Sequence, residues 1–202
     1  LNSLYPHLIM QYNISPETLL DTRHPHSGVD KILNQEVTFE MYKDNAICAN
    51  GAMYRKDIRG FLPELMEKIY KDRTIYKKKM LEAKQQYEKK KTKALEKEIS
   101  RCNNIQMARK IQLNSAYGAI GNQYFRYYKL ANAEAITLSG QVSIRWIENK
   151  MNQKINQILK TEDVDYVIAS DTDSIYLNLG PLVEAVYEGR EKTNESIVSF
   201  LN

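Results

Sequence analysis

Apolar and polar side chains alternate between residues 35 and 55, and this period of two predicts β structure. The apolar members of the alternation are Val37, Phe39, Met41, Ala46, Ile47, Met53 and Tyr54. Two turn-forming pairs, Asp-Asn and Asn-Gly, interrupt the segment. The pattern therefore predicts a short hairpin or a pair of strands in this part of the chain.

The first 34 residues combine a short apolar stretch with turn and loop signals. An extended start is expected to turn at Pro6. Ser15, followed by proline and glutamate, is typical of a helix start in which serine is the N-cap. His24 and His26 are of a residue type that binds metals, but they flank a proline in the turn-rich segment TRHPHSG and lack nearby partners, which favours a polar loop.

From Pro63 to about Arg101 the chain changes to strong helix formers, uninterrupted by glycine or by further proline. So long a helix cannot pack on itself, and a second apolar series follows it. We therefore predict an antiparallel helical hairpin with its tip within residues 84–97. A free-standing coiled coil is the alternative, but the apolar series is too irregular for sustained heptads. The expected seam consists of Leu62, Leu65, Ile69, Tyr76 and Met80 against Leu95, Ile99, Met107, Ile111 and Leu113.

The last third of the chain begins with an aromatic cluster, QYFRYYKL, after Gly118 and Gly121. A further helix is expected over residues 132–160. Two short runs rich in β-branched or aromatic residues, YVIAS and SIYLNL, then bracket the letters DTDS, which predicts a strand, a tight turn and a strand. The core candidates of the helix are Ile136, Leu138, Val142, Ile144, Trp146, Ile147 and Ile155.

The composition of the 202-residue chain, 43% apolar and 27% charged, is that of a globular protein with one domain or two small ones. No apolar run is long enough to span a bilayer, so we expect no membrane association and a cytoplasmic setting. Cys48 and Cys102 lie far apart and form no CxxC pair, so the sequence suggests neither a disulfide framework nor a zinc site.

The net charge of +4 is unevenly distributed, because residues 66–101 carry thirteen Lys and Arg against six Asp and Glu. A basic arm on an otherwise acidic body is expected where one element meets phosphates and another collects carboxylates. A merely solvated helix explains the same run of charge.

Four groups of side chains are candidates for chemistry. One is Tyr5, held beside Pro6 in SLYPH, a pattern that is equally typical of a core tyrosine next to a turn. Asp171 and Asp173 lie two residues apart in the predicted turn, which is suited to hard cations such as Mg²⁺, although aspartate also favours turns for other reasons. Lys110, Asn114 and Tyr117 form one stripe of a helix that ends near a glycine. Arg73 and Lys77 lie on the preceding helix. If the two helices pair, these two cations converge with Lys110 and form a clamp for a triphosphate.

Taken in order, the segments SLYP, KIQLNSAYG and DTDS resemble motifs A, B and C of family B DNA polymerases. The NISPET run and the GNQYFRYY run also resemble the polymerases of T-even-like bacteriophages (myoviruses). The resemblance implies an α+β fold: a partial palm, made of an antiparallel sheet with packed helices, and a fingers domain that is an antiparallel helical hairpin. It assigns residues 1–60 to the first part of the palm, 61–118 to the fingers, and 119–202 to the second part of the palm and the start of a further helix.

The resemblance also implies a role for each matching residue. Asp171 and Asp173 become catalytic ligands of two Mg²⁺ ions. Tyr5 becomes the steric gate that excludes a 2′-hydroxyl, while Tyr117 and Gly118 contact the nascent base pair and the DNA. The implied nucleotide-binding residues are Arg73, Lys77, Lys110, Asn114 and the backbone amides of Ser3, Leu4 and Tyr5.

Two departures from the family pattern are expected to matter. The motif A aspartate is expected immediately before Leu1, so we expect the chain to be an inactive fragment of a longer enzyme. His7 replaces the serine that usually follows SLYP, and its role is open.

The implied function is that of a replicative DNA-directed DNA polymerase, which transfers a nucleotidyl group from a deoxynucleoside triphosphate (dNTP) to a primer 3′-hydroxyl. The implied partners are primer-template DNA, dNTP and a sliding clamp, in the cytoplasm of an infected bacterial host. A non-catalytic nucleic-acid-binding module and a helical scaffold protein built on residues 63–113 remain as alternatives.

Overall fold

The structure is a computed structural model, and it describes residues 3–188 and 193–201. The chain forms two compact units, residues 1–142 and residues 143–202. The described part mixes helices with two small antiparallel sheets, which confirms the expected α+β class at this level. None of the described helices is long and apolar enough to cross a membrane.

The first unit begins with helix α1 (Leu4–Tyr12), so the expected extended start with a turn at Pro6 is wrong. Pro6 lies in the first turn of α1, where proline is tolerated because the N–H groups of that turn have no partner within the helix. Asn13 follows with a φ of 56°, the left-handed conformation that commonly ends a helix.

The helix start expected at Ser15 is also wrong, because this serine opens a turn. The backbone N–H groups of Thr18 and Leu19 both donate to the Ser15 carbonyl, and the chain then enters strand β1 (Leu19–Arg23). Serine and proline serve equally well at the first positions of a type I turn, so the local signal was ambiguous.

Strands β2 (Asn45–Ile47) and β3 (Ala52–Arg55) pair antiparallel, which confirms the second half of the expected β segment. With β1 they form a sheet in the order β1-β3-β2. The first half of the alternation, around Val37 to Met41, forms no described strand, and it contains the short 3₁₀ helix η1 (Glu40–Tyr42). Val37 and Phe39 are half-buried but Met41 is 91% exposed, so the apolar side of this alternation does not face a core along its whole length.

The loop that was expected around His24 precedes a short helix, α2 (Val29–Leu33). His24 is buried, and its ring lies 5.4 Å from that of Phe39 and 5.0 Å from that of Tyr42 between centroids. The His24 side chain therefore packs against two aromatic rings. Cys48 and Cys102 are free and buried, and burial raises the pKa of Cys48 to about 12.

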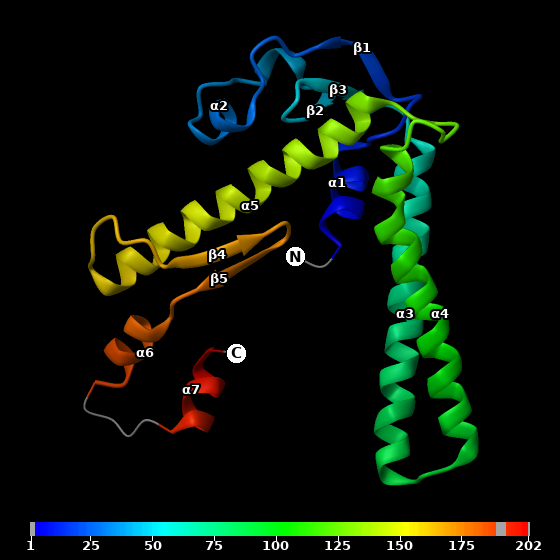
Figure 1. The fold of residues 1–202 in the computed structure, drawn as a ribbon, viewed down its shortest axis with the longest axis vertical. Coiled ribbons are helices and arrows are strands. Elements are labelled where there is room, and N and C mark those ends of the chain that lie inside the picture. Colours follow the sequence, from blue (N-terminus) through cyan, green and yellow to red (C-terminus); the bar gives the residue numbers. More distant parts are fainter. Residues whose placement is uncertain (1–2, 189–192, 202) are drawn as a thin grey trace. The chain divides into compact units, whose positions relative to one another are not determined.

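Helices α3 (Phe61–Lys89) and α4 (Lys93–Ile120) form the expected antiparallel hairpin, with its tip at residues 90–92 (Figure 1). The two helices lie side by side along their length (Figure 1). Thr92 is the N-cap of α4, and its hydroxyl accepts a hydrogen bond from the Leu95 N–H at 3.3 Å.

The seam between α3 and α4 differs from the expected one. Leu65, Met107 and Ile111 are 44%, 43% and 59% exposed, so they lie outside the seam. The buried and half-buried positions recur instead at alternating spacings of three and four, which is a regular heptad pattern. These positions are Leu62, Met66, Ile69, Arg73, Tyr76, Met80 and Ala83 on α3, and Leu95, Ile99, Cys102, Gln106, Arg109, Leu113, Ala116 and Ile120 on α4. The apolar residues alone look irregular because three positions of the regular pattern are occupied by polar side chains, Arg73, Gln106 and Arg109.

Helix α5 (Leu130–Leu159) confirms the expected long helix and runs through the boundary between the units. In the first unit, the Tyr54 hydroxyl on β3 donates to the Asn132 side-chain oxygen on α5 at 2.8 Å. Ile136, Ile144 and Ile155 are buried, but Trp146 is 54% exposed and was wrongly counted among the core candidates. The core of the first unit is contributed mainly by α1, β2, β3, α3, α4 and the start of α5.

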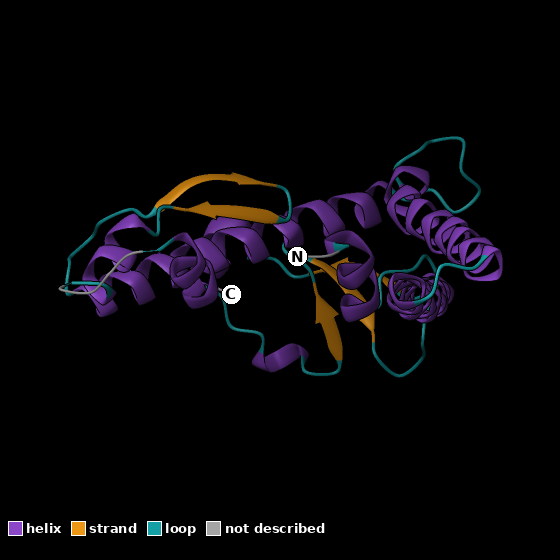
Figure 2. Ribbon diagram, turned by 90° about the horizontal axis from the view of Figure 1, so that it is seen from below, coloured by secondary structure: helices purple, strands orange, loops and turns teal. Residues whose placement is uncertain are grey.

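The second unit contains the two strands that were expected around DTDS, β4 (Val167–Asp171) and β5 (Ser174–Leu177). They pair antiparallel and lie side by side in Figure 2. Helices α6 (Gly180–Val186) and α7 (Asn194–Leu201) follow.

Candidate functional site

Helices α1, α3 and α4 bring together several of the side chains that were predicted to handle a nucleotide. The Arg73 guanidinium on α3 donates through Nη1 to the Ser3 hydroxyl at the start of α1, at 3.4 Å. The Arg73 Nε atom is buried and has no hydrogen-bond partner among the described residues. A buried N–H without an acceptor is costly, and Arg109 Nε on α4 is in the same state among the described residues.

A second contact joins α1 to α4. The rings of Tyr5 and Tyr117 lie 4.8 Å apart between centroids and are tilted by 56°. Gly140 on α5 also lies close to Tyr5, because a Cβ atom at position 140 would be 3.3 Å from Tyr5 Cε1. Both tyrosines are half-buried, and Tyr5 is in contact with the Tyr117 ring and close to the backbone at Gly140.

The remaining predicted cations are exposed. Lys77 and Lys110 form no ion pair with the described residues, and Asn114 is exposed as well. Asp72 and Arg109 form an ion pair at 3.4 Å across the hairpin. Because Arg73 and Lys110 each follow one member of this pair, they lie at the same level along the two helices.

Gly118 lies near the C-terminal end of α4, and a Cβ atom there would meet nothing within 4 Å. The backbone around Gly118 is therefore open to a neighbour.

His7, whose role was open, is exposed and contacts α3 at the surface of the first unit. Its Nδ1 atom lies 2.9 Å from the Ser3 carbonyl oxygen, and its ring meets the Tyr70 ring edge-on at 4.7 Å between centroids. His7 thus joins α1 to α3 close to Arg73. Sequence reasoning missed this contact because nothing in the residue order shows which turn of α3 meets α1.

In the second unit, Asp171 and Asp173 lie at the corner of the β4–β5 hairpin, as expected. Asp171 ends β4 and pairs with Ser174, while Asp173 is in the turn. Thr172 between them has a φ of 45°, and its hydroxyl donates to Asp171 Oδ1 at 3.0 Å. Asp171 is exposed, and carboxylate oxygens at an accessible turn are donors of the kind that Mg²⁺ prefers.

Metal coordination at this corner would need further oxygen donors. The described residues contain no group of three or more His, Cys, Asp or Glu side chains placed to hold a metal ion. The two aspartates fit a divalent cation that takes its other ligands from water and phosphate, which is how Mg²⁺ is commonly bound beside a nucleotide.

Comparison with known proteins gives one consistent result. The family model described as DNA polymerase family B matches residues 1–195. The DNA-directed DNA polymerase of Enterobacteria phage T4 is 34% identical over 100% of this chain and 27% of its own length, and that of Escherichia phage RB69 is 33% identical with the same coverage. The chain therefore spans about a quarter of the length of these curated relatives.

The fold is similar to that of a solved structure as well. The family B DNA polymerase from the hyperthermophilic archaeon Pyrobaculum calidifontis has a TM-score of 0.59 and 23% identity to this chain, over 94% of this chain and 21% of that protein. Because the family model covers nearly the whole sequence, the chain belongs to DNA polymerase family B.

Proposed function

We propose that this chain supplies the nucleotide-handling part of a DNA-directed DNA polymerase, which transfers a nucleotidyl group from a dNTP to the 3′-hydroxyl of a primer. Residues 1–60 and 119–202 are proposed as parts of the palm, and residues 61–118 as the fingers. The observation that carries this proposal is the half-buried Arg73, whose Nε has no partner among the described residues and whose Nη1 reaches Ser3. Membership of the family supports the same activity.

The triphosphate is proposed to lie against α3, α4 and the start of α1. Arg73 supplies a planar fork that suits two phosphate oxygens, while Lys77 and Lys110 supply mobile point charges from exposed positions. The backbone amides of Ser3, Leu4 and Tyr5 extend this set, and Asn114 supports it. These groups neutralise charge and hold the nucleotide in place, which is the protein's main contribution to phosphoryl transfer.

Selection of the sugar is proposed to rest on Tyr5. A 2′-hydroxyl can be excluded only by a ring whose position is fixed, and the Tyr5 ring packs against Tyr117 and lies close to Gly140. Tyr117 and Gly118 are proposed to face the nascent base pair, where the open surface at Gly118 leaves room for DNA.

Asp171 and Asp173 are proposed to bind two Mg²⁺ ions. When bound, such ions stabilise the attacking and leaving oxygens of an in-line displacement. Primer-template DNA and dNTP are the proposed substrates, a sliding clamp is a proposed partner, and the cytoplasm of an infected bacterial host is the proposed location. The phage origin of the relatives supports this location.

The proposal is tested by the Asp173→Ala variant of the full-length protein that carries this chain. We expect incorporation of dNTP to fall by about three orders of magnitude or more, because a metal-binding carboxylate is lost. The matched control is Glu162→Ala, which removes an exposed carboxylate from a loop of the same unit and is expected to leave incorporation unchanged.

Thermal melting shows whether both variants are folded. Normal incorporation by a folded Asp173→Ala protein would refute the assignment of this residue. A wild-type protein that binds DNA but incorporates no nucleotide would instead favour a non-catalytic nucleic-acid-binding module.

A further inference from the structure

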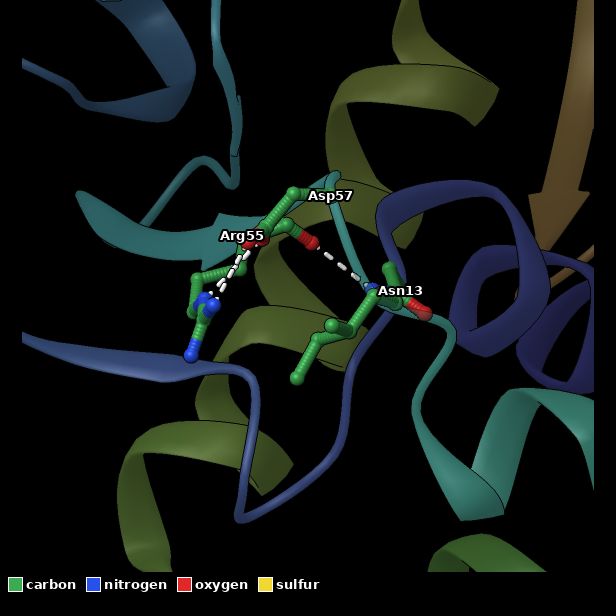
Figure 3. Close-up of polar contacts among 4 residues, drawn as sticks. Asn13, Arg55 and Asp57 are labelled. Carbon is green, nitrogen blue, oxygen red and sulfur yellow. Dashed lines mark hydrogen bonds and ion pairs between the residues drawn. The ribbon is translucent and has the colours of Figure 1, made fainter.

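The turn that follows α1 holds the N-terminal end of α3. The Asn13 side chain accepts a hydrogen bond from the Gly60 N–H at 2.9 Å. It also donates through Nδ2 to the carbonyl oxygens of Arg55 at 2.7 Å and Ile58 at 2.8 Å. Figure 3 shows Asn13 pointing to the backbone at Arg55, whose side chain in turn pairs with Asp57. One buried amide thus connects α1, the end of β3 and the start of α3.

Two more side chains of the same turn complete the capping of α3. Glu17 accepts from the Phe61 N–H at 2.6 Å, and the Ser15 hydroxyl accepts from the Leu62 N–H at 3.4 Å and donates to Glu17 at 2.6 Å. Gly60, the N-cap residue, has no side chain of its own to offer. We call Asn13, Ser15 and Glu17 the capping cluster.

The electrostatics of the capping cluster agree with its geometry. Burial alone would raise the pKa of Glu17, but the hydrogen bonds from the Ser15 hydroxyl and the Phe61 N–H outweigh it and lower the pKa below its ordinary value. A carboxylate at a helix N-terminus is also favoured by the helix dipole. The cluster therefore holds a charged group against the first turn of α3 at neutral pH.

The approach between the turn and α3 is close. A Cβ atom at Gly60 would lie 2.6 Å from Ser15 Cβ, so the backbone of position 60 is in direct contact with the capping cluster. A contact of this kind leaves α3 little freedom to tilt about its first turn.

The capping cluster and the proposed nucleotide contacts lie on the same two helices. Asn13 ends α1, whose other end carries Ser3 and Tyr5, and Gly60 begins α3, which carries Arg73. Arg73 lies about 20 Å along α3 from Gly60 at 1.5 Å per residue, so a tilt of about 5° at the first turn moves the guanidinium by roughly 2 Å. A shift of this size takes a guanidinium N–H out of the ~2.7–3.2 Å range of a hydrogen bond to a phosphate oxygen, which weakens binding of the nucleotide.

We infer that Asn13 is a positioning residue, which fixes the tilt of α3 relative to α1 so that Arg73 meets the triphosphate of a nucleotide whose sugar lies at Tyr5. This inference rests on the proposed function. Asn13 itself touches no substrate, and its effect is transmitted through the first turn of α3.

The test compares two cap removals on the same hairpin, both made in the full-length protein. Asn13→Gly removes all three hydrogen bonds while keeping the left-handed backbone, since glycine adopts a φ of 56° without strain. Thr92→Gly removes the cap of α4 at the far end of the hairpin. Both variants are expected to lose thermal stability, since each gives up a helix cap.

Only Asn13→Gly is expected to impair nucleotide use. We predict that KM for dNTP rises about tenfold or more, with a smaller change in kcat and an unchanged Kd for primer-template DNA, because the triphosphate contact is displaced rather than removed. Thr92→Gly is expected to keep the wild-type KM. Asn13→Asp keeps an acceptor for the Gly60 N–H but turns a carboxylate toward two carbonyls, so an intermediate KM is expected.

Each result decides the matter. A KM within twofold of wild type in the Asn13→Gly protein would show that Asn13 only stabilises the fold, and an equal rise in both glycine variants would show a general loosening of the hairpin. Should Asn13→Gly not fold, the KM of Asn13→Asp decides by itself, with a wild-type value overturning the inference. Failure of the proposed function has a separate signature, because Asp173→Ala would then incorporate normally.

Discussion

The base and the tip of the α3–α4 hairpin are built from the same helix formers but are held very differently. At the base, Leu62, Met66, Leu113 and Ile120 are all buried, and the capping cluster covers the first turn of α3. At the tip, four lysine side chains are exposed, those of Lys89, Lys90, Lys91 and Lys93. The hairpin is therefore held more firmly at its base than at its tip, and Arg73, which is proposed to bind the nucleotide, lies in the half of α3 nearer the base.

Electrostatic contacts in the half of the hairpin nearer the tip do little to offset this difference. Hydrogen bonds from the Arg101 guanidinium and from Cys102 lower the pKa of Glu98 to about 2, so the carboxylate stays charged at neutral pH. The pair is exposed to solvent, and such pairs contribute little to stability. The tip is therefore expected to open more readily than the base.

The largest expected effect is at the base, where Leu113 is 1% exposed. Leu113→Ala should lower the free energy of unfolding by about 2–5 kcal/mol, because it leaves a cavity in the core that α4 shares with α1. The matched control is Ile111→Ala on the same helix, since Ile111 is 59% exposed and its loss should change stability by no more than ~0.5 kcal/mol.

Urea unfolding followed by circular dichroism measures both changes. An equal loss of unfolding free energy in the two variants would mean that the base is no better packed than the outer face of the hairpin, which would contradict the difference between base and tip.

A smaller effect is expected where the base meets the capping cluster. Gly60→Ala places a Cβ atom 2.6 Å from Ser15 Cβ, and relief of this overlap should cost about 1–3 kcal/mol. Gly118→Ala adds the same methyl group to α4 where nothing lies within 4 Å, and it should stabilise the helix by about 0.5–1 kcal/mol.

Thermal melting of the two proteins gives opposite shifts if the approach at Gly60 is as close as described. A shift of the melting temperature in the same direction in both proteins would show that the capping cluster accommodates the added methyl group without loss of stability.

Helices and strands that follow from the order of apolar and polar residues within one segment were predicted well from the sequence. The long run without glycine after Pro63 and the two β-rich runs around Asp171 gave the α3–α4 and β4–β5 hairpins. Motif order gave the family, which the family model confirms. The structure brings Arg73 to Ser3 and Tyr117 to Tyr5, while the roles of these residues toward a nucleotide stay predictions.

The features that depend on distant partners were missed. Ser15 was read as the cap of a helix that follows it, whereas it contributes to capping α3, which begins 46 residues later, and no local signal distinguishes these uses. Arg73 and Arg109 were left out of the hairpin seam because they are charged, although their spacing fits it. Such side chains are recognised as seam members only when the burial of the paired helices is known.

The central claim, that the half of the hairpin nearer its fixed base binds the nucleotide, is tested most directly by the KM for dNTP of two charge removals in the full-length protein. Arg73→Ala should raise KM by about 10- to 100-fold, the equivalent of the ~1.5–3 kcal/mol of a hydrogen bond to a charged group, while Lys89→Ala at the tip should leave KM unchanged. An unchanged KM in a folded Arg73→Ala protein, or an equal rise in both variants, would contradict the account.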